Sequence, residues 1–262
     1  MRYGVLSDVH ANAAALRTAV GRLRAAGVDG WLCAGDIVGY GPHPNECVDL
    51  LAGIGARCVA GNHELMVLGT LETQRAGRLA RETTPWTRSV LRDDCRAFLA
   101  DLPTVLRLPG LVMAHGSLTD VETYVTRAPQ AAQELEKLRR REAGAGVLVL
   151  GHTHRQWLFD PAGGTLAAPA GPEWPFPETG PFLVNPGSVG QSRQRERAPR
   201  ARFLLLDMER RRLRFFAEPY DAAATLAALR RHGLPRSCVH VPPGRLRAVP
   251  RRVATLLRHA RR

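Results

Sequence analysis

Short motifs rich in histidine, aspartate and asparagine recur along this chain, and their side chains are of the types that bind metal ions. In chain order they are Asp8-Val9-His10, Gly35-Asp36, Gly61-Asn62-His63-Glu64, Ala114-His115-Gly116 and Gly151-His152-Thr153-His154. Side chains two apart on an extended segment project to the same side, which brings Asp8 beside His10 and His152 beside His154. A glycine next to most of these residues lets the backbone turn sharply and approach a ligand closely.

Two carboxylates, one carboxamide and four imidazoles in one cleft are enough to hold two divalent metal ions if one carboxylate bridges them. The candidate ligands are Asp8, His10, Asp36, Asn62, His115, His152 and His154. Nitrogen and oxygen donors without thiolates favour Mn²⁺, with Fe, Zn²⁺, Ni²⁺ and Co²⁺ as alternatives, and the imidazoles argue against a purely Mg²⁺ or Ca²⁺ site. Two such ions about 3.5 to 4 Å apart hold a shared hydroxide and clamp the attacking and leaving oxygens of an in-line displacement at phosphorus. The motifs therefore predict hydrolysis of a phosphate ester or anhydride.

Apolar runs that end in these motifs predict the strands that position them. The runs cover residues 3–8, 31–36, 57–63, 111–115, 147–154 and 182–185. Between them lie helical stretches, of which the clearest begins at Asn12, a good N-cap, and ends at Gly27. Strands that alternate with helices predict an α/β fold, in which the carboxyl ends of neighbouring strands open onto one crevice.

The remaining sequence predicts further helices, one antiparallel element and one irregular segment. Helices are expected over residues 45–54, 86–99 and 130–142, and a hairpin is expected from strands 202–208 and 213–218 around a turn at 209–212. These elements predict an α/β sandwich with a mixed or double sheet. Residues 160–181 hold six prolines and four glycines and predict a loop, which either covers the substrate or is a surface insertion.

The 262 residues are 45% hydrophobic, which excludes disorder of the whole chain, and their formal charge is +13. All the excess positive charge lies in residues 191–262, where 19 arginines face 5 acidic residues. This region either binds a polyanion such as nucleic acid or forms the solvated face of an arginine-rich protein. We favour the second interpretation because no nucleic-acid-binding module accompanies the arginines. Residues 251–262 predict a basic amphipathic helix that docks on its own domain, with membrane or partner binding as the alternative.

The five cysteines are scattered and never form a CxxC pair, so neither a disulfide framework nor a thiolate zinc site is expected. The first residues lack the apolar core of a signal peptide, and no stretch approaches the ~20 apolar residues that cross a bilayer. These features predict a cytoplasmic protein without a transmembrane segment. The sequence carries no prediction of the oligomeric state.

The ordered set of motifs resembles that of the calcineurin-like metallophosphoesterases over residues 1 to about 220. The resemblance implies a four-layer α/β/β/α sandwich of two mixed β-sheets flanked by helices. We expect a catalytic domain at residues 1–220 and a basic helical extension at residues 221–262. The resemblance also implies which residues hold the two metal ions: Asp8, His10, Asp36 and His154 hold one, and Asp36, Asn62, His115 and His152 hold the other, so that Asp36 is the bridge.

Three further residues are candidates for contact with the substrate. By the resemblance His63 binds no metal and donates a proton to the leaving oxygen, and an imidazole beside two cations is a reasonable general acid. Asn12 either contacts a phosphate oxygen or only caps its helix. Tyr40 stands where the family's serine/threonine phosphatases and symmetrical dinucleoside tetraphosphatases have an arginine, and it either lines the pocket or packs under the loop.

Residues 39–47 and the motif Asn185-Pro186-Gly187-Ser188 resemble the small prokaryotic phosphodiesterase branch of the family. We therefore predict a metal-dependent phosphoesterase, with phosphodiesterase-like activity on a small phosphate ester or a dinucleoside polyphosphate. A metal-bridging hydroxide would attack in line while His63 assists the leaving group. The alternatives are an asymmetric diadenosine tetraphosphate hydrolase and a non-catalytic scaffold whose basic tail binds nucleic acid.

Overall fold

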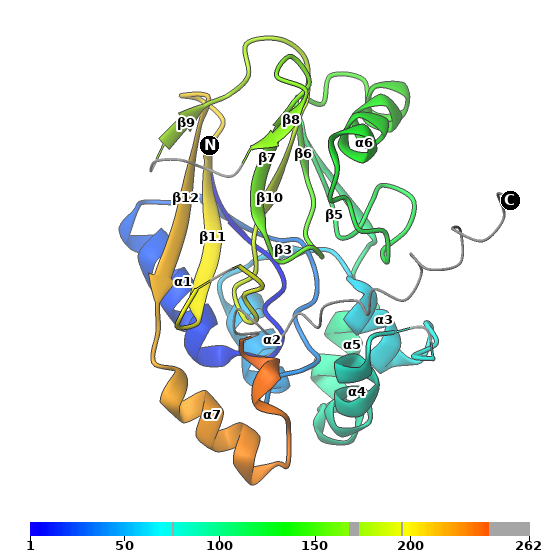
Figure 1. The fold of residues 1–262 in the computed structure, drawn as a ribbon, viewed down its shortest axis with the longest axis vertical. Helices are drawn as coiled ribbons and strands as arrows, with labels where there is room; N and C mark the ends of the chain where they lie inside the picture. The colour runs from blue at the N-terminus through cyan, green and yellow to red at the C-terminus, as the bar shows by residue number, and fades with distance from the viewer. Residues whose placement is uncertain (75, 168–172, 195, 241–262) are drawn as a thin grey trace, which may run out of the picture.

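Two mixed β-sheets form the centre of the fold (Figure 1). The computed structural model describes residues 1–240 except residues 75, 168–172 and 195, and within this part each sheet has six strands. The first sheet has the order β3 (Arg57–Cys58), β2 (Gly30–Cys33), β1 (Arg2–Leu6), β11 (Arg200–Asp207), β12 (Arg212–Pro219), β9 (Glu173–Pro175). The second has the order β4 (Val105–Leu108), β5 (Leu111–Ala114), β6 (Val147–Val149), β10 (Phe182–Pro186), β7 (Gln156–Asp160), β8 (Thr165–Ala167).

Three neighbouring parallel strands in each sheet carry the predicted motifs. In the first sheet β1, β2 and β3 are parallel, and in the second β5, β6 and β10 are parallel. The remaining pairs are antiparallel, including the predicted hairpin of β11 and β12, which pairs Asp207 with Arg212 next to its turn. The carboxyl ends of the parallel strands therefore open toward the same part of the molecule.

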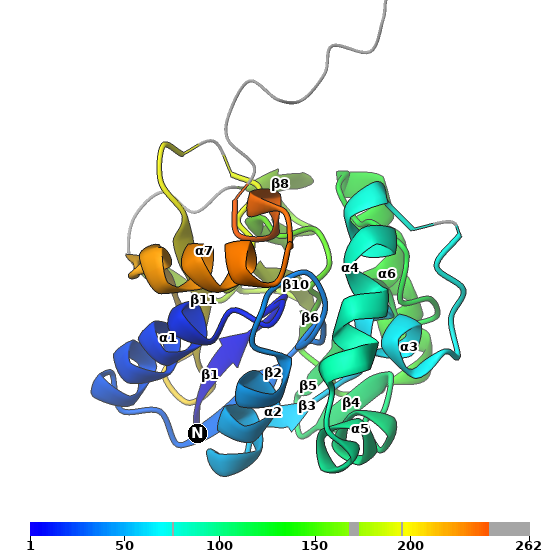
Figure 2. The same cartoon turned by 90° about the horizontal axis from the view of Figure 1, so that it is seen from below.

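Side-chain alternation builds the layers. Val5 of β1 packs in the core between the sheets with Val149 of β6, whereas the next residue, Leu6, packs with Leu16 in the core beneath helix α1. The helices are α1 (Ala13–Ala25), α2 (Pro44–Gly53), α3 (Asn62–Leu68), α4 (Arg78–Val90), α5 (Asp93–Ala100), α6 (Ala128–Arg141) and α7 (Ala222–Arg231). Figure 2 shows α1 and α2 on the side of the first sheet and α6 on the side of the second. The predicted α/β/β/α sandwich is confirmed.

The predicted helix over residues 86–99 is wrong, because two helices meet there. Helix α4 begins at Arg78, and the chain becomes extended at Leu91 before α5 begins at Asp93. The Arg92 guanidinium forms ion pairs with Asp49 and Asp94 that hold this break. The aspartates in the first turn of α5 favour a new helix start, since negative charge stabilises a helix N-terminus.

The prediction of an irregular loop over residues 160–181 is also partly wrong. The segment contributes β8 and β9, each at the outer edge of a sheet. Trp174 and Phe176 pack in the core between the sheets, and the described residues of this segment do not line the cavity at the metal-binding motifs. The described part of the segment is therefore a structural edge of both sheets and not a cover over the site.

Residues 221–240 pack against the rest of the fold. Helix α7 lies along α1 (Figure 2), and Leu229, Leu234 and Cys238 are buried together with Tyr40 and Met66. A division of the chain at residue 220 stays a prediction, and the helix expected over 251–262 lies outside the described residues. All five cysteines are buried and free. None of the helices described has the length and apolar character needed to cross a membrane.

Candidate metal centre

The seven predicted ligands follow the carboxyl ends of strands from both sheets, and all seven are buried. Five of them have left-handed backbones, with φ between 47° and 64°: Asp8, His10, Asp36, His152 and His154. Residues other than glycine adopt this region at a strain of about 1 to 3 kcal/mol each. Such strain persists only where the surroundings fix it, and here it aims five side chains from the turns after β1, β2 and β6 into one small volume.

The first group of candidate ligands consists of Asp8, His10, Asp36 and His154, whose ligand atoms all lie within 4.8 Å of one another. Nε2 of His154 is 3.0 Å from Nε2 of His10 and 3.3 Å from Oδ1 of Asp8. Nδ1 of His154 donates to the carbonyl of Gln191 at 2.6 Å, so Nε2 carries the lone pair. An imidazole lone pair that faces a carboxylate and a second imidazole is the arrangement of a metal-binding site.

The second group consists of Asp36, His115 and His152, with Asn62 beside them. Nε2 of His115 is 3.2 Å from Oδ2 of Asp36 and 3.1 Å from both Oδ1 of Asn62 and Nδ1 of His152. The outer nitrogens of the two rings are engaged, because His115 Nδ1 donates to the Ala34 carbonyl and His152 Nε2 to the Glu122 carbonyl. With His115 neutral, four acceptor atoms face one another, and a positive charge stabilises this arrangement, either a proton on His115 Nε2 or a metal ion among the four atoms.

The electrostatics of the cluster agree with this interpretation. Burial lowers the pKa of His152 to about 3 and that of His10 well below its ordinary value, so both rings are neutral, as metal ligands must be. Burial also lowers the pKa of His115, but the neighbouring Asp36 carboxylate has the larger effect and raises this pKa to about 9. Burial raises the pKa of Asp8 to about 7. The buried carboxylates therefore favour a cation at this place, and the shared Asp36 joins the two groups.

Glu64 is a functional residue to which the sequence analysis assigned no role. Its carboxylate accepts hydrogen bonds from the backbone nitrogens of Asp36, Ile37, Val38 and Gly61, at 2.7 to 3.1 Å. It thereby ties the turn after β2 to the turn after β3. The signal in the sequence is its place three residues after Gly61, as in a capping box at the start of α3. Gly61 is required there because a Cβ would lie 2.2 Å from Oδ1 of Asp36.

Two further side chains that the ligand analysis did not include hold the turns after β1 and β6. Ser7 donates its hydroxyl to Oδ2 of Asp8 at 2.6 Å, and the backbone nitrogen of His152 donates to the same carboxylate. Asn185, in the motif noted in the sequence, donates to the carbonyl of Gly151 at 2.6 Å. These hydrogen bonds fix the orientation of ligands that come from different sheets.

A cavity of about 460 Å³ opens beside both groups, and His63 and Tyr40 line it. The His63 ring packs against those of His10 and Tyr40, with ring centroids 4.8 and 4.4 Å away. Its backbone nitrogen donates to Oδ1 of Asp36 at 3.0 Å, and burial lowers its pKa to about 4. Tyr40 also packs with Met66 under its loop, so the structure combines both of the roles considered for it.

Asn12 is absent from the lining of this cavity, and the structure favours the capping role for it. Its Oδ1 accepts from the backbone nitrogen of Ala15 at 3.3 Å and from the Thr225 hydroxyl. Its Nδ2 donates to the Gly190 carbonyl and to the Tyr220 hydroxyl. Because the protein engages both ends of the buried carboxamide, the capping alternative is favoured, and contact of Asn12 with a substrate stays a prediction.

Comparison with known proteins places the chain in a family. The model of the calcineurin-like phosphoesterase superfamily domain matches residues 1–211, which contain every motif described above. A crystal structure of a metallophosphoesterase from Sphaerobacter thermophilus is 30% identical, with a TM-score of 0.78 over 91% of this chain and 96% of that one. An uncharacterized protein of Methanocaldococcus jannaschii is 26% identical over 88% of this chain and 93% of its own length.

A third similarity covers a smaller part of the chain. The symmetrical bis(5′-nucleosyl)-tetraphosphatase of Vibrio parahaemolyticus is 31% identical over 117 residues, which are 43% of this chain and 42% of that enzyme. The family match, in contrast, spans the strands and turns that build the whole site. The chain therefore belongs to the calcineurin-like phosphoesterase superfamily and is a phosphoesterase.

Proposed function

We propose that this phosphoesterase uses two divalent metal ions to hydrolyse a phosphodiester or a phosphoanhydride. The observation that carries the proposal is the pair of ligand groups that meet at Asp36. In each group, oxygen and nitrogen acceptor atoms lie close together and outnumber the hydrogen-bond donors among them. Bound at these groups, two ions would supply Lewis-acid charge for the phosphate and a nucleophile derived from water. We favour Mn²⁺, with Fe, Zn²⁺, Ni²⁺ and Co²⁺ as alternatives.

The protein's own residues have distinct tasks in this proposal. Asp8, His10, Asp36 and His154 hold one ion, and Asp36, Asn62, His115 and His152 hold the other. The carbonyls of Ala34, Glu122 and Gln191 fix the outer nitrogens of three of the imidazoles, which keeps the other nitrogens free as ligands. Ligand positions thus exist before substrate binds, so little reorganisation accompanies the reaction.

His63 is the proposed general acid. It lines the cavity beside the ligand groups, and its main chain is held by Asp36. Burial lowers its pKa and keeps the ring neutral, and the charge of an anionic phosphate against the ring would raise this pKa and favour protonation. That proton is then placed for transfer to the leaving oxygen, a step that contributes about 10²- to 10⁴-fold in rate when the leaving group is poor.

The proposed substrates are small phosphodiesters and dinucleoside polyphosphates. Tyr40 offers an aromatic edge in the cavity, where the symmetrical tetraphosphatases of the family are expected to have an arginine. This difference favours asymmetric over symmetric cleavage of diadenosine tetraphosphate as the second candidate activity. A cytoplasmic location and nucleic-acid binding by the basic C-terminal residues stay predictions.

Metal analysis combined with a defined assay tests the proposal. The protein, loaded with Mn²⁺, is assayed with bis(p-nitrophenyl) phosphate and with diadenosine tetraphosphate, and the nucleotide products are identified. We expect turnover that Asp36→Asn abolishes and that Asp101→Asn, an exposed carboxylate at the end of α5, leaves unchanged. AMP with ATP as products shows asymmetric cleavage, and two ADP show symmetric cleavage. Absence of turnover on every phosphate substrate refutes the proposal.

A further inference from the structure

Arg193 lines the cavity of the metal centre without a carboxylate partner. Its Nε lies 3.3 Å from Oε1 of Gln191 and its Nη1 3.4 Å from the hydroxyl of Tyr124, and both of these partners are neutral. Among the described residues no Asp or Glu forms an ion pair with it, and residues 75, 168–172, 195 and 241–262 contain no Asp or Glu in the sequence. The Asp8 carboxylate of the metal centre acts on this guanidinium through space, but no carboxylate pairs with it directly. A partly buried guanidinium without an ion-pair partner favours an anion beside it.

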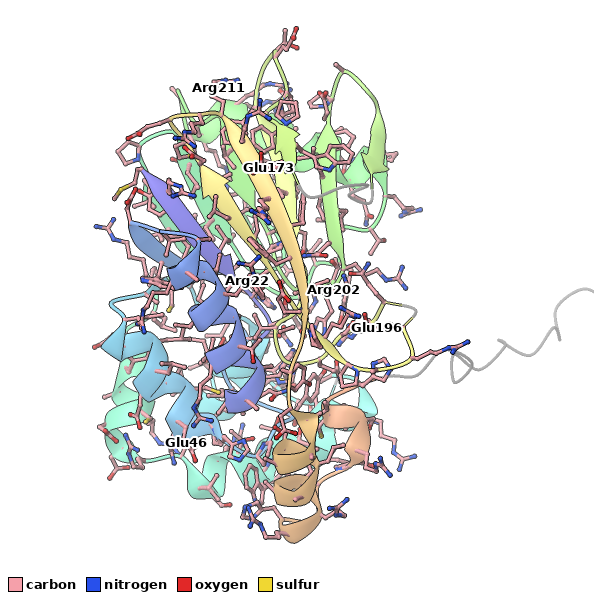
Figure 3. The ribbon with its side chains drawn as sticks, turned by 90° about the vertical axis from the view of Figure 1, so that its left-hand side faces the viewer. Arg22, Glu46, Glu173, Glu196, Arg202 and Arg211 are labelled. Carbon is pink, nitrogen blue, oxygen red and sulfur yellow. The ribbon has the colours of Figure 1, made fainter. Side chains whose placement is uncertain are left out.

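The loop that carries Arg193 is anchored on both sides. Glu196 forms an ion pair with Arg202 of β11 at 2.6 Å, and both side chains are largely buried (Figure 3). Gln191 Nε2 donates to the carbonyl of Ser237 at 2.7 Å, and the Gln191 carbonyl accepts from the ligand His154. Residues on both sides of Arg193 are therefore anchored beside the metal centre, and such preorganisation lowers the cost of binding a phosphate there.

Tyr124 adds an aromatic surface at the same place. Its side chain is 46% exposed, although large apolar side chains of the described residues are otherwise mostly buried. Its ring lies on the ring of the ligand His152, with centroids 3.9 Å apart and an interplanar angle of 35°. The free part of the ring borders the cavity next to the Arg193 guanidinium. A flat ring beside a cation suits a ligand that has both an aromatic base and a phosphate.

We propose that Arg193 binds the phosphate next to the one that reacts and that Tyr124 receives the base of the same nucleotide, so the site selects nucleoside polyphosphates over simple diesters. The inference rests on the proposed function, since the two ligand groups account only for the reacting phosphate. A guanidinium beside two divalent cations is repelled by them, and the added negative charge of a second phosphate relieves that repulsion. The planar guanidinium can also bind two phosphate oxygens at once.

A binding experiment tests the subsite without catalysis. Isothermal titration compares the methylene analogue of ADP, which has a second phosphate and resists hydrolysis at the bridge, with AMP, at fixed free Mn²⁺. We expect the wild type to bind the analogue at least tenfold more tightly than AMP, and Arg193→Gln to remove most of this preference. Arg193→Lys keeps the positive charge but loses the planar guanidinium that binds two phosphate oxygens at once. This variant should therefore show an intermediate preference for the analogue over AMP. Arg197→Gln, an exposed arginine of the same loop, is the matched control and should keep the preference of the wild type.

A kinetic experiment separates this inference from the proposed function. The ratio of kcat/KM for diadenosine tetraphosphate to that for bis(p-nitrophenyl) phosphate should fall about 10- to 100-fold in Arg193→Gln, as for the loss of a charged hydrogen-bonding pair. It should change less than twofold in Arg197→Gln. An equal effect of Arg193→Gln on both substrates, or equal affinity of the wild type for the analogue and AMP, overturns the subsite. A wild type that hydrolyses neither substrate refutes the proposed function, while the titration still decides whether Arg193 binds a second phosphate.

Discussion

Single side chains hold the geometry of this site, and Glu64 is the clearest example because one carboxylate serves four backbone nitrogens. We expect Glu64→Gln to destabilise the protein by about 2 to 4 kcal/mol, because the amide nitrogen cannot accept hydrogen bonds and leaves buried N–H groups without a partner. Urea unfolding at pH 8 measures this, above the pKa of about 7 to which burial raises Glu64. Glu136→Gln, an exposed partner of Arg140, should remain within about 0.5 kcal/mol of the wild type. Equal stability of the two variants would contradict this role.

A second prediction concerns His63 and depends on the leaving group of the substrate. With a sugar hydroxyl as leaving group, as in a dinucleoside monophosphate, His63→Ala should lower kcat by about 10²- to 10⁴-fold, because this poor leaving group needs a proton donor. With p-nitrophenolate, which leaves without a proton, the loss should be less than tenfold. Stopped assays on a dinucleoside monophosphate and on bis(p-nitrophenyl) phosphate measure the two losses. His232→Asn, an exposed histidine at the end of α7, is the control. Equal losses on both substrates would assign His63 a role in packing or metal binding instead.

The sequence predicted the identity of the candidate ligands but not the groups that orient them. Asp8, Asp36 and His115 could be found because their types and neighbours are unusual at the ends of apolar runs. The orienting groups are mostly backbone atoms, such as the carbonyls of Ala34 and Gln191, and any residue type supplies a carbonyl. Arg193 could be singled out only in the folded chain, since nothing in the sequence separates it from the other arginines, whereas among the described residues it lines the cavity without a carboxylate partner.

At the scale of elements, Asn12 joins the start of α1 to α7 and to the turn after β10. Asn12→Ala should therefore destabilise the protein by about 2 to 4 kcal/mol, which is more than the loss of an ordinary cap, because the Gly190 carbonyl and the Thr225 hydroxyl also lose a partner. Asp221→Ala removes the exposed cap of α7 and should cost only about 0.5 to 1 kcal/mol. Thermal unfolding and kcat/KM are measured together. A raised KM with unchanged stability would return Asn12 to the role of a phosphate ligand.

The elements that the sequence analysis missed are those whose conformation depends on distant residues. Strand β9 exists because its residues pair with Arg212 to Arg214 of β12, although its own proline, Pro175, argues against a strand. The break between α4 and α5 is held by Asp49, more than forty residues away in the sequence. In contrast, α1 was predicted in full because its cap, apolar face and terminating glycine are all local.

At the scale of the whole molecule, each proposed ion joins the two sheets. Asp8, Asp36 and Asn62 follow strands of the first sheet, whereas His115 and His154 follow strands of the second. Both ligand groups contain residues from both sheets. A bound ion therefore cross-links the layers of the fold in addition to its chemical role, and stability should depend on the metal as activity does.

Metal loading should accordingly raise the thermal stability in two increments. An ion that binds only the folded chain stabilises it by about 2.7 kcal/mol at a free concentration of 100 times its Kd, or several degrees in Tm for a chain of this size. His152→Ala removes a ligand of the second group alone and should retain one increment, whereas Asp36→Asn removes the shared ligand and should lose most of both. The metal is first removed with a chelator, and Mn²⁺ is then added back in steps. Scanning calorimetry and metal analysis at each step distinguish the wild type, His152→Ala and Asp36→Asn. If Asp36→Asn bound two ions per chain and gained the stability of the wild type, the two groups would not share a bridge, and the phosphate chemistry would need another arrangement of metal ions.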